Sequence, residues 1–158
     1  MTLHARRRLL GGLAGGAAGL ALALRPLAAG AQPLEASLQA AIRAWAGSAL
    51  PRAGRVQLDI APLVDNGNAV PIVVRVASPM SEADHVREVI VFSERNPLRE
   101  MLRCELGPWN GAVDGHAELG ARVRLATSQR VVALARMSDG GVWQHTVDVL
   151  VTLAACIE

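Results

Sequence analysis

The stretch QRVVALARMSDGGVWQHTVDVLVTL, residues 129–153, decides the fold. Residues 129–137 form a mostly apolar run, and residues 142–153 alternate between apolar and polar positions. A turn sequence rich in Asp and Gly between two such runs, here Ser138-Asp139-Gly140-Gly141, is typical of a β-hairpin. The stretch therefore predicts two antiparallel strands joined by a tight turn. His145 falls on the apolar face of the second strand, where a hydrogen-bonded core or interface histidine is expected.

The preceding residues show the same period of two. Asp65-Asn66-Gly67-Asn68 and the loop 108–115 separate these runs, and no helical pattern lies between them. Six or seven short strands with this spacing predict an all-β, antiparallel β-sandwich. The predicted strands upstream of the hairpin are 55–60, 70–76, 87–92, 101–106 and 118–125.

An amphipathic helix is expected ahead of the strands, within residues 32–50. Its apolar stripe is Leu34, Leu38, Ile42 and Trp45, spaced by four, four and three, as on one helix face. Gly47 can end this helix. The helix is expected to lie against the sandwich, which spans residues 54–153.

Residues 1–31 have the pattern of a secretory signal. Arg6-Arg7-Arg8 precedes an apolar run of Gly, Ala and Leu, and Ala29-Gly30-Ala31 resembles a signal peptidase site. The paired arginines indicate the twin-arginine branch of export. The apolar run is shorter than the roughly 20 residues that span a bilayer. We therefore expect a periplasmic protein with no membrane segment after cleavage.

Composition narrows the possible functions. The chain has 16 basic and 14 acidic residues, and four of the basic residues are arginines of the predicted signal, which leaves 12 − 14 = −2 for the rest. That balance gives no support for a nucleic-acid or anionic-membrane partner. With three Trp, one Phe and no Tyr, the chain is also poor in aromatic surfaces for stacking bases or sugars.

No self-contained active site can be found in the sequence. The sequence contains no G-x-S-x-G hydrolase motif, no H-E-x-x-H metal motif and no paired C-x-x-C, and its Gly-rich runs, which could otherwise bind a phosphate, occur only in the predicted signal. His85 and His116 lie near predicted strand starts and are expected to be solvated. We therefore predict a protein that is not an enzyme and that needs no cofactor.

Two cysteines remain. Cys104 lies within a predicted strand, where a small buried hydrophobe is the ordinary interpretation. Cys156 lies in the tail Ala154-Ala155-Cys156-Ile157-Glu158, directly after the last predicted strand. No basic neighbour favours its thiolate and Glu158 disfavours it, so a partner would have to activate this thiol. Cys156 is therefore an attachment point for a carried group, or half of a disulfide with Cys104 or with another chain.

Several blocks of the sequence resemble SoxY, the sulfur-carrying subunit of the periplasmic SoxYZ complex of thiosulfate oxidation. The resemblance covers about residues 54–156. The blocks that carry it, in order, are Asn66-Gly67-Asn68 with Val70-Pro71, Ser78-Pro79-Met80, Phe92 to Asn96-Pro97, Arg122-Val123-Arg124-Leu125-Ala126 and Met137-Ser138-Asp139-Gly140.

The resemblance implies an immunoglobulin-like sandwich that pairs with a SoxZ-like subunit and carries sulfur intermediates covalently on a cysteine in a flexible C-terminal arm. Only Cys156 matches the carrier position. SoxY ends in Gly-Gly-Cys-Gly-Gly, whereas the ending Ala154, Ala155, Cys156, Ile157, Glu158 resembles a SoxY-related group named for its AACIE arm. The bulk of Ile157 and the charge of Glu158 would hinder entry into a channel shaped for glycine. The expected partners are therefore a SoxZ-like subunit and oxidoreductases of a Sox-like or related pathway.

Overall fold

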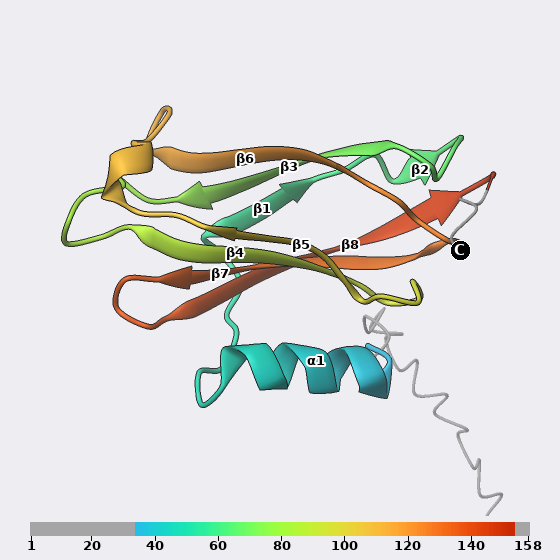
Figure 1. Cartoon of the computed structure of the whole chain (residues 1–158), viewed down its shortest axis with the longest axis horizontal. Helices are drawn as coiled ribbons and strands as arrows, with labels where there is room; N and C mark the ends of the chain where they lie inside the picture. Colours follow the sequence, from blue (N-terminus) through green and yellow to red (C-terminus); the bar gives the residue numbers. More distant parts are fainter. Residues whose placement is uncertain (1–33, 154–158) are drawn as a thin grey trace, which may run out of the picture. The chain divides into compact units, whose positions relative to one another are not determined.

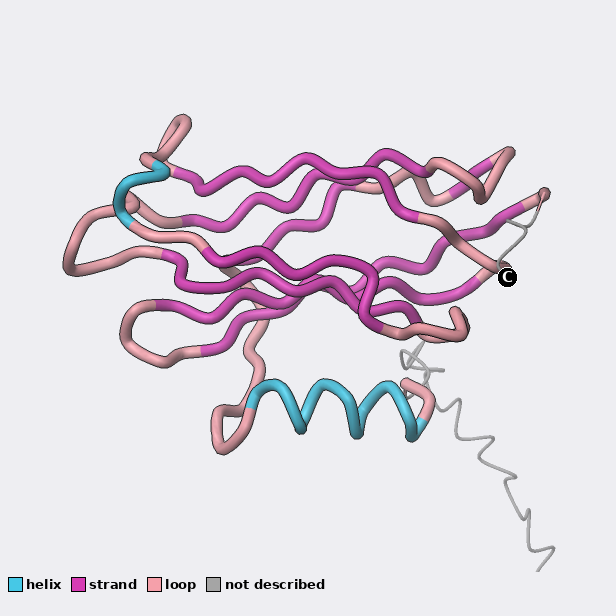
Figure 2. The backbone as a smooth tube through the Cα atoms, in the orientation of Figure 1, coloured by secondary structure: helices cyan, strands magenta, loops and turns pink. Residues whose placement is uncertain are grey.

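The computed structural model describes residues 34–153. Two β-sheets lie face to face, and one helix covers the outer face of the larger sheet (Figures 1 and 2). The predicted class, a mostly β sandwich with a short helix ahead of it, is confirmed. The predicted signal and the tail 154–158 lie outside the described residues.

The larger sheet has five strands in the order β2-β8-β7-β4-β5. Its centre is the hairpin of β7 and β8, whose register pairs Gln129 with Val149 and Arg136 with Val142. β4 lies antiparallel to both β7 and β5. The bounds are β2 Leu63–Val64, β4 Val86–Ser93, β5 Glu100–Glu105, β7 Gln129–Met137 and β8 Val142–Val151.

The smaller sheet has three strands in the order β1-β3-β6, all antiparallel. Its inward side chains meet those of the larger sheet in one apolar core, as alternation along each strand requires. Val70, Ile72, Val74 and Val76 are almost fully buried there. The bounds are β1 Val56–Asp59, β3 Val70–Ala77 and β6 His116–Val123, with a short 3₁₀ helix at Pro108–Asn110 before β6.

The helix α1 spans Ala36–Ala46 and confirms the predicted element. Leu38 and Ile42 of its apolar stripe are buried against Ile90 and Phe92 of β4 and against outward side chains of β7. β4 and β7 are therefore apolar on both faces, because one face meets the opposite sheet and the other meets α1. Gly47 ends the helix with φ of 67° and donates its N–H to the carbonyl of Arg43.

Two details of the predicted sandwich are corrected. β2 was not predicted, and it pairs with β8 in parallel, through Leu63 with Leu150 and Val64 with Val151. β6 begins and ends two residues earlier than expected, although Leu125 beyond its end is still fully buried. The strand ends there because the Arg124 carbonyl is bound by the side chain of Asn96 and the Leu125 N–H by the carbonyl of Gly67.

His145 is exposed, so of the two predicted positions, core or interface, the core is wrong. The hydrogen bond is present, because His145 Nδ1 accepts the backbone N–H of Leu58 at 3.0 Å. β1 is an edge strand, and β8 pairs with the short β2 only near its end. His145 therefore joins the two sheets where neither edge has a strand partner at this position.

Candidate functional site

The predicted site residues, Cys156 with Ala154, Ala155, Ile157 and Glu158, lie outside the described residues. We refer to residues 154–158 as the arm segment. The structure does describe the point from which this segment leaves the sandwich, at the end of β8. We refer to residues 151–153 with their bonding partners in 64–67 and Ser128 as the arm root.

Hydrogen bonds hold the arm root from both sides. On one side, Thr152 donates its N–H to the carbonyl of Val64 at 3.0 Å and its hydroxyl to the carbonyl of Asp65 at 3.0 Å. On the other side, the Ser128 hydroxyl oxygen accepts the N–H of Val151 at 2.9 Å. Beyond these bonds, Gly67 donates its N–H to the carbonyl of Leu153 at 2.8 Å. The backbone is therefore bonded up to the residue before the arm segment.

A buried asparagine fixes the loops beside the arm root. Asn96 donates from Nδ2 to the carbonyl of Arg124 at 2.8 Å, and its Oδ1 accepts the N–H of Ala126 at 2.9 Å and Nε2 of Gln129 at 2.8 Å. Both side chains are buried, where an unbonded amide would cost free energy. Asn96 thus ties the β4–β5 loop to the β6–β7 connection.

An ion pair lies next to these loops, between Glu94 and Arg130. The Arg130 guanidinium is the main cause of the low pKa of Glu94, which falls to about 2, and the N–H of Glu35 at the start of α1 also donates to that carboxylate. The Glu94 side chain is 8% exposed, so water screens the pair weakly. The negative charge of Glu94 at the N-terminus of α1 also interacts favourably with the helix dipole.

Cys104 does not approach the arm segment. It lies on the edge strand β5 and is half-buried, which corrects its interpretation as a small buried hydrophobe. Across the sheet it is level with Trp143, through Val89 and Ala135. Trp143 precedes Leu153 along β8 by about 30 Å at the usual rise per residue.

The two cysteines of one chain are therefore too far apart to form a disulfide. Three extended residues from Leu153 to Cys156 span at most about 11 Å. A disulfide needs Cα atoms within about 7 Å of each other. Together these distances fall well short of Cys104, so an intramolecular Cys104–Cys156 bond would require part of the sandwich to unfold.

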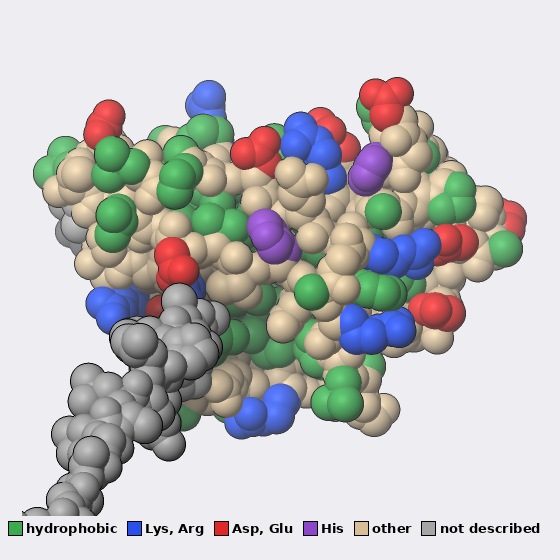
Figure 3. All heavy atoms as spheres, turned by 180° about the vertical axis from the view of Figure 1, so that it is seen from behind, with side chains coloured by type: hydrophobic (Ala, Val, Ile, Leu, Met, Phe, Trp, Pro, Cys, Tyr) green, Lys and Arg blue, Asp and Glu red, His purple; other side chains and the backbone are tan. Residues whose placement is uncertain are grey.

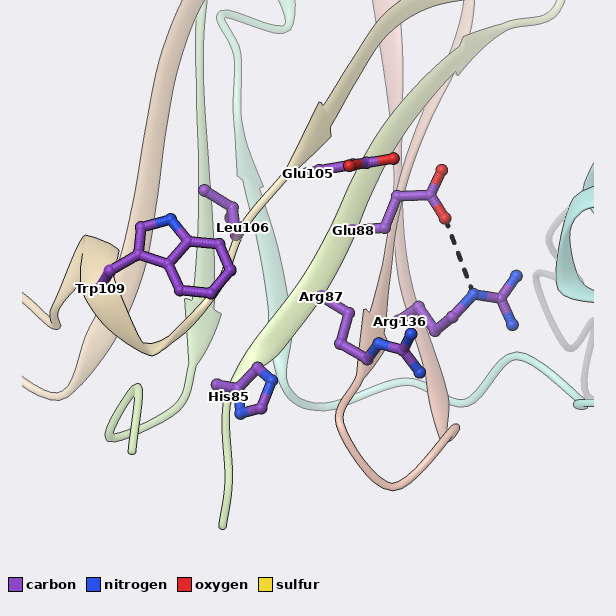
Figure 4. Close-up of a pocket in the computed structure, with 7 residues that line it drawn as sticks. All are labelled: His85, Arg87, Glu88, Glu105, Leu106, Trp109 and Arg136. Carbon is purple, nitrogen blue, oxygen red and sulfur yellow. Dashed lines mark ion pairs between the residues drawn. The ribbon is translucent and has the colours of Figure 1, made fainter. Parts of the chain in front are cut away.

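A hollow lies at the far end of the sandwich from the arm root, with a volume of about 420 Å³. Figure 4 shows Trp109 on one side of it and Arg136 on the other, with Arg136 Nε 3.7 Å from Glu88 Oε2. Trp109 is 83% exposed, and its ring lies so close to Gly107 that a Cβ there would be 2.3 Å from it. His85 lines this hollow and is half-buried, whereas it was expected to be solvated.

The surface of the described region mixes the two signs of charge. Figure 3 shows acidic and basic side chains interspersed on one face, with apolar side chains between them. Within residues 34–153, no group of three or more His, Cys, Asp or Glu side chains could hold a metal ion. In the same region, no helix has the length and apolar character that crossing a bilayer requires.

The model of the family described as "Sulfur oxidation protein SoxY" matches residues 42–156. This range covers most of the chain and ends on Cys156. The chain belongs to the SoxY family.

Two solved structures show the same fold. The sulfur carrier protein SoxY from Chlorobium limicola f thiosulfatophilum aligns with a TM-score of 0.60 and 22% identity, over 75% of this chain and all of that one. A Thermotoga maritima protein provisionally assigned as a superoxide reductase aligns with a TM-score of 0.52 and 21% identity, over 65% of this chain and 87% of that one. At these identities the likeness shows the fold alone. No curated protein sequence matches the chain.

The structure explains why three of the SoxY-like sequence blocks occur together. Asn66-Gly67-Asn68 bonds Leu153, Asn96-Pro97 supplies the buried asparagine, and Arg122 to Ala126 supplies the backbone groups that Asn96 and Gly67 bind. These blocks are far apart in sequence and meet beside the arm root. Sequence reasoning missed Ser128 and Gln129 in this cluster, because neither stands in a recognisable motif.

Proposed function

We propose that this SoxY-family protein carries a sulfur intermediate covalently on Cys156 and presents it to partner enzymes. The observation that carries the proposal is that the family match extends to Cys156, directly beyond an arm root that is hydrogen-bonded up to Leu153. A thiol beyond a fixed attachment point can be offered to a partner while the sandwich stays folded.

The chemistry of loading needs a partner. Joining the Cys156 thiolate to a sulfur anion forms an S–S bond and releases two electrons, which a loading oxidoreductase must accept. The thiolate is the reacting form, and no basic residue adjoins Cys156 in sequence. The protein would therefore be a carrier without catalysis of its own, and the partner would activate the thiol.

The proposed setting is the periplasm, reached by a twin-arginine signal in residues 1–31. There the sandwich would pair with a SoxZ-like subunit, as membership of the SoxY family suggests. Oxidoreductases of a Sox-like or related pathway would attach the sulfur intermediate to the arm segment and remove it.

The composition of the arm segment supports a loading enzyme other than that of thiosulfate carriers. Alanine restricts the backbone more than glycine does, and Ile157 and Glu158 add bulk and charge. Replacing residues 154–158 by Gly-Gly-Cys-Gly-Gly gives the matched control. We expect the purified enzyme that loads thiosulfate onto SoxY carriers to load it onto that variant and much less onto the natural arm segment. Equal loading would contradict a distinct loading partner.

The carrier role is tested by intact-mass analysis of protein purified from its native periplasm. We expect an adduct that reductant removes, that is lost in Cys156→Ser and that is retained in Cys104→Ser. Two blocked cysteines and a mass lower by two hydrogens, or a covalent dimer through Cys156, would instead support the alternative of a structural module with a disulfide staple. An adduct on Cys104 would also contradict the proposal.

A further inference from the structure

A groove lies at the same end of the sandwich as the arm root, between the loop before β5 and the end of β6. Its volume is about 330 Å³. One wall is apolar, and its most prominent side chain, Leu98, is 81% exposed. We refer to this groove as the arm-end groove. Its lining residues are Asn96, Pro97, Leu98, Glu100, Met101, Arg122, Val123 and Arg124.

The arm-end groove carries excess positive charge. Arg122 and Arg124 are exposed, and neither forms an ion pair with any side chain in residues 34–153. Glu100, the one carboxylate of the lining, is already paired with Arg103 at 2.8 Å. The groove therefore offers two cationic groups beside an exposed apolar wall.

The groove is within reach of the arm segment. Leu153 is hydrogen-bonded to Gly67, and Gly67 is hydrogen-bonded to Leu125, the neighbour of Arg124. Residues joined by such a backbone hydrogen bond have Cα atoms about 5 Å apart, so Leu125 lies within about 10 Å of Leu153. An extended chain of five residues spans up to about 17 Å. Residues 154–158 are thus long enough to reach from Leu153 into the groove.

We propose that the arm-end groove binds the protein's own arm segment when no partner enzyme is engaged. Ile157 packs on the apolar wall, Glu158 pairs with Arg124 or Arg122, and Cys156 between them and the arm root is covered. The occupant is assigned by length, by the apolar–acidic order of Ile157 and Glu158, and by charge complementarity. This inference goes beyond the carrier role, because it concerns the unloaded thiol and does not depend on the cargo.

The test measures how fast the neutral reagent iodoacetamide alkylates Cys156 in the full mature protein, with Cys104 followed separately by peptide mapping. Leu98→Ser and Arg124→Glu should each accelerate alkylation of Cys156 at least three-fold. The matched controls are Leu50→Ser, since Leu50 is 85% exposed elsewhere on the molecule, and Arg87→Glu at the opposite end. Neither control should change the rate.

The sign of the Arg124→Glu effect is diagnostic. Replacing a cation by an anion near a thiol lowers the thiolate fraction and slows alkylation, so acceleration can come only from loss of shelter. Ile157→Ser, which alters no residue of the sandwich 34–153 and leaves charge unchanged, should accelerate alkylation as well. Equal or slower rates in Leu98→Ser, Arg124→Glu and Ile157→Ser would overturn the proposal. A periplasmic adduct on Cys156 would still be detectable by mass in that case, so the two proposals fail separately.

Discussion

Gly67 donates its N–H to the carbonyl of Leu153 across 2.8 Å, while its own carbonyl accepts the N–H of Leu125 at 2.8 Å. One turn residue therefore connects the end of the last strand to the connection between β6 and β7. The arm segment begins at a fixed point on the rim of the sandwich. Under the proposed carrier role, a partner enzyme that receives Cys156 would have this rim as a fixed reference surface.

The Ser128 hydroxyl should hold the arm root locally. Ser128→Ala removes the acceptor for the Val151 N–H, and we expect that amide to exchange with deuterium about ten-fold faster. Global stability should fall by less than about 1 kcal/mol, because the site is near a strand end. Thr127→Ala, at an exposed neighbour, is the control. Exchange of Val151 at an unchanged rate in Ser128→Ala would show that the hydroxyl does not restrain this end of β8.

Asn96 should contribute strongly to folding. Asn96→Ala leaves the Arg124 carbonyl, the Ala126 N–H and the Gln129 amide without their present partner. Since unbonded buried polar groups are costly, we expect a loss of about 2–4 kcal/mol in the free energy of unfolding, measured with urea. The comparison variant is Asn110→Ala, whose side chain is exposed and accepts one N–H, from Gly107. A loss for Asn96→Ala no larger than for Asn110→Ala would count against this account.

The Glu94–Arg130 pair should make stability depend on pH. The folded-state pKa of Glu94, about 2, lies below the ordinary value of 4.5, so the carboxylate stabilises the fold above pH 4.5. That contribution is lost as pH falls from about 5 towards 2, because the proton then binds the unfolded chain first. The shift corresponds to at most about 3 kcal/mol at pH 7.

The measurement is urea unfolding of Glu94→Gln and of the natural protein at pH 7 and pH 2.5. We expect the variant to be about 2–3 kcal/mol less stable at pH 7, with the gap shrinking below about 1 kcal/mol at pH 2.5. Glu100→Gln removes a carboxylate that is 43% exposed, and its effect should stay below about 1 kcal/mol at pH 7. A gap for Glu94→Gln that is constant with pH would mean that the ion pair is not its cause.

Leu38 should hold α1 against the larger sheet. Its side chain is fully buried against β4 and β7, so Leu38→Ala should cost about 2–4 kcal/mol through lost burial and the cavity that remains. Leu50→Ala removes the same atoms from an 85% exposed position and should change stability by less than about 0.5 kcal/mol. Thermal unfolding followed by circular dichroism separates the two. Similar melting temperatures for both variants would indicate that α1 is dispensable to the sandwich.

The sequence was sufficient for features that depend on local pattern. The β7–β8 hairpin follows from the turn 138–141 and the flanking alternation, and α1 follows from the stripe at Leu38 and Ile42. β2 could not be predicted, because two residues carry no periodicity and their pairing with β8 depends on the folded sandwich. His145 has the same parity as Trp143, Val147 and Val149, which form or contact the core, yet it lies at the sheet edge beside β1 and is exposed.

For the candidate site, the sequence led to a chemical hypothesis but not to the surroundings of the arm segment. Cys156 stood out by its position in sequence, and three SoxY-like blocks were recognisable, but no sequence pattern shows that Gly67, Asn96 and Arg124 meet beside Leu153. Such convergence depends on strand order, which period-two patterns leave open. Cys104 was misjudged for the same reason, because burial in a strand depends on whether that strand lies at a sheet edge.

The separation of Cys104 from the arm root means that the two native cysteines can report a long intramolecular distance. Cys104 is half-buried on β5, level with the start of β8, so it marks one end of the sandwich while Cys156 follows the other. A spin label on each thiol would report the distribution of distances between them without any engineered cysteine. Departure of the arm segment towards a partner enzyme would then be visible as a change in that distribution, and the same pair of labels would serve for every partner tested.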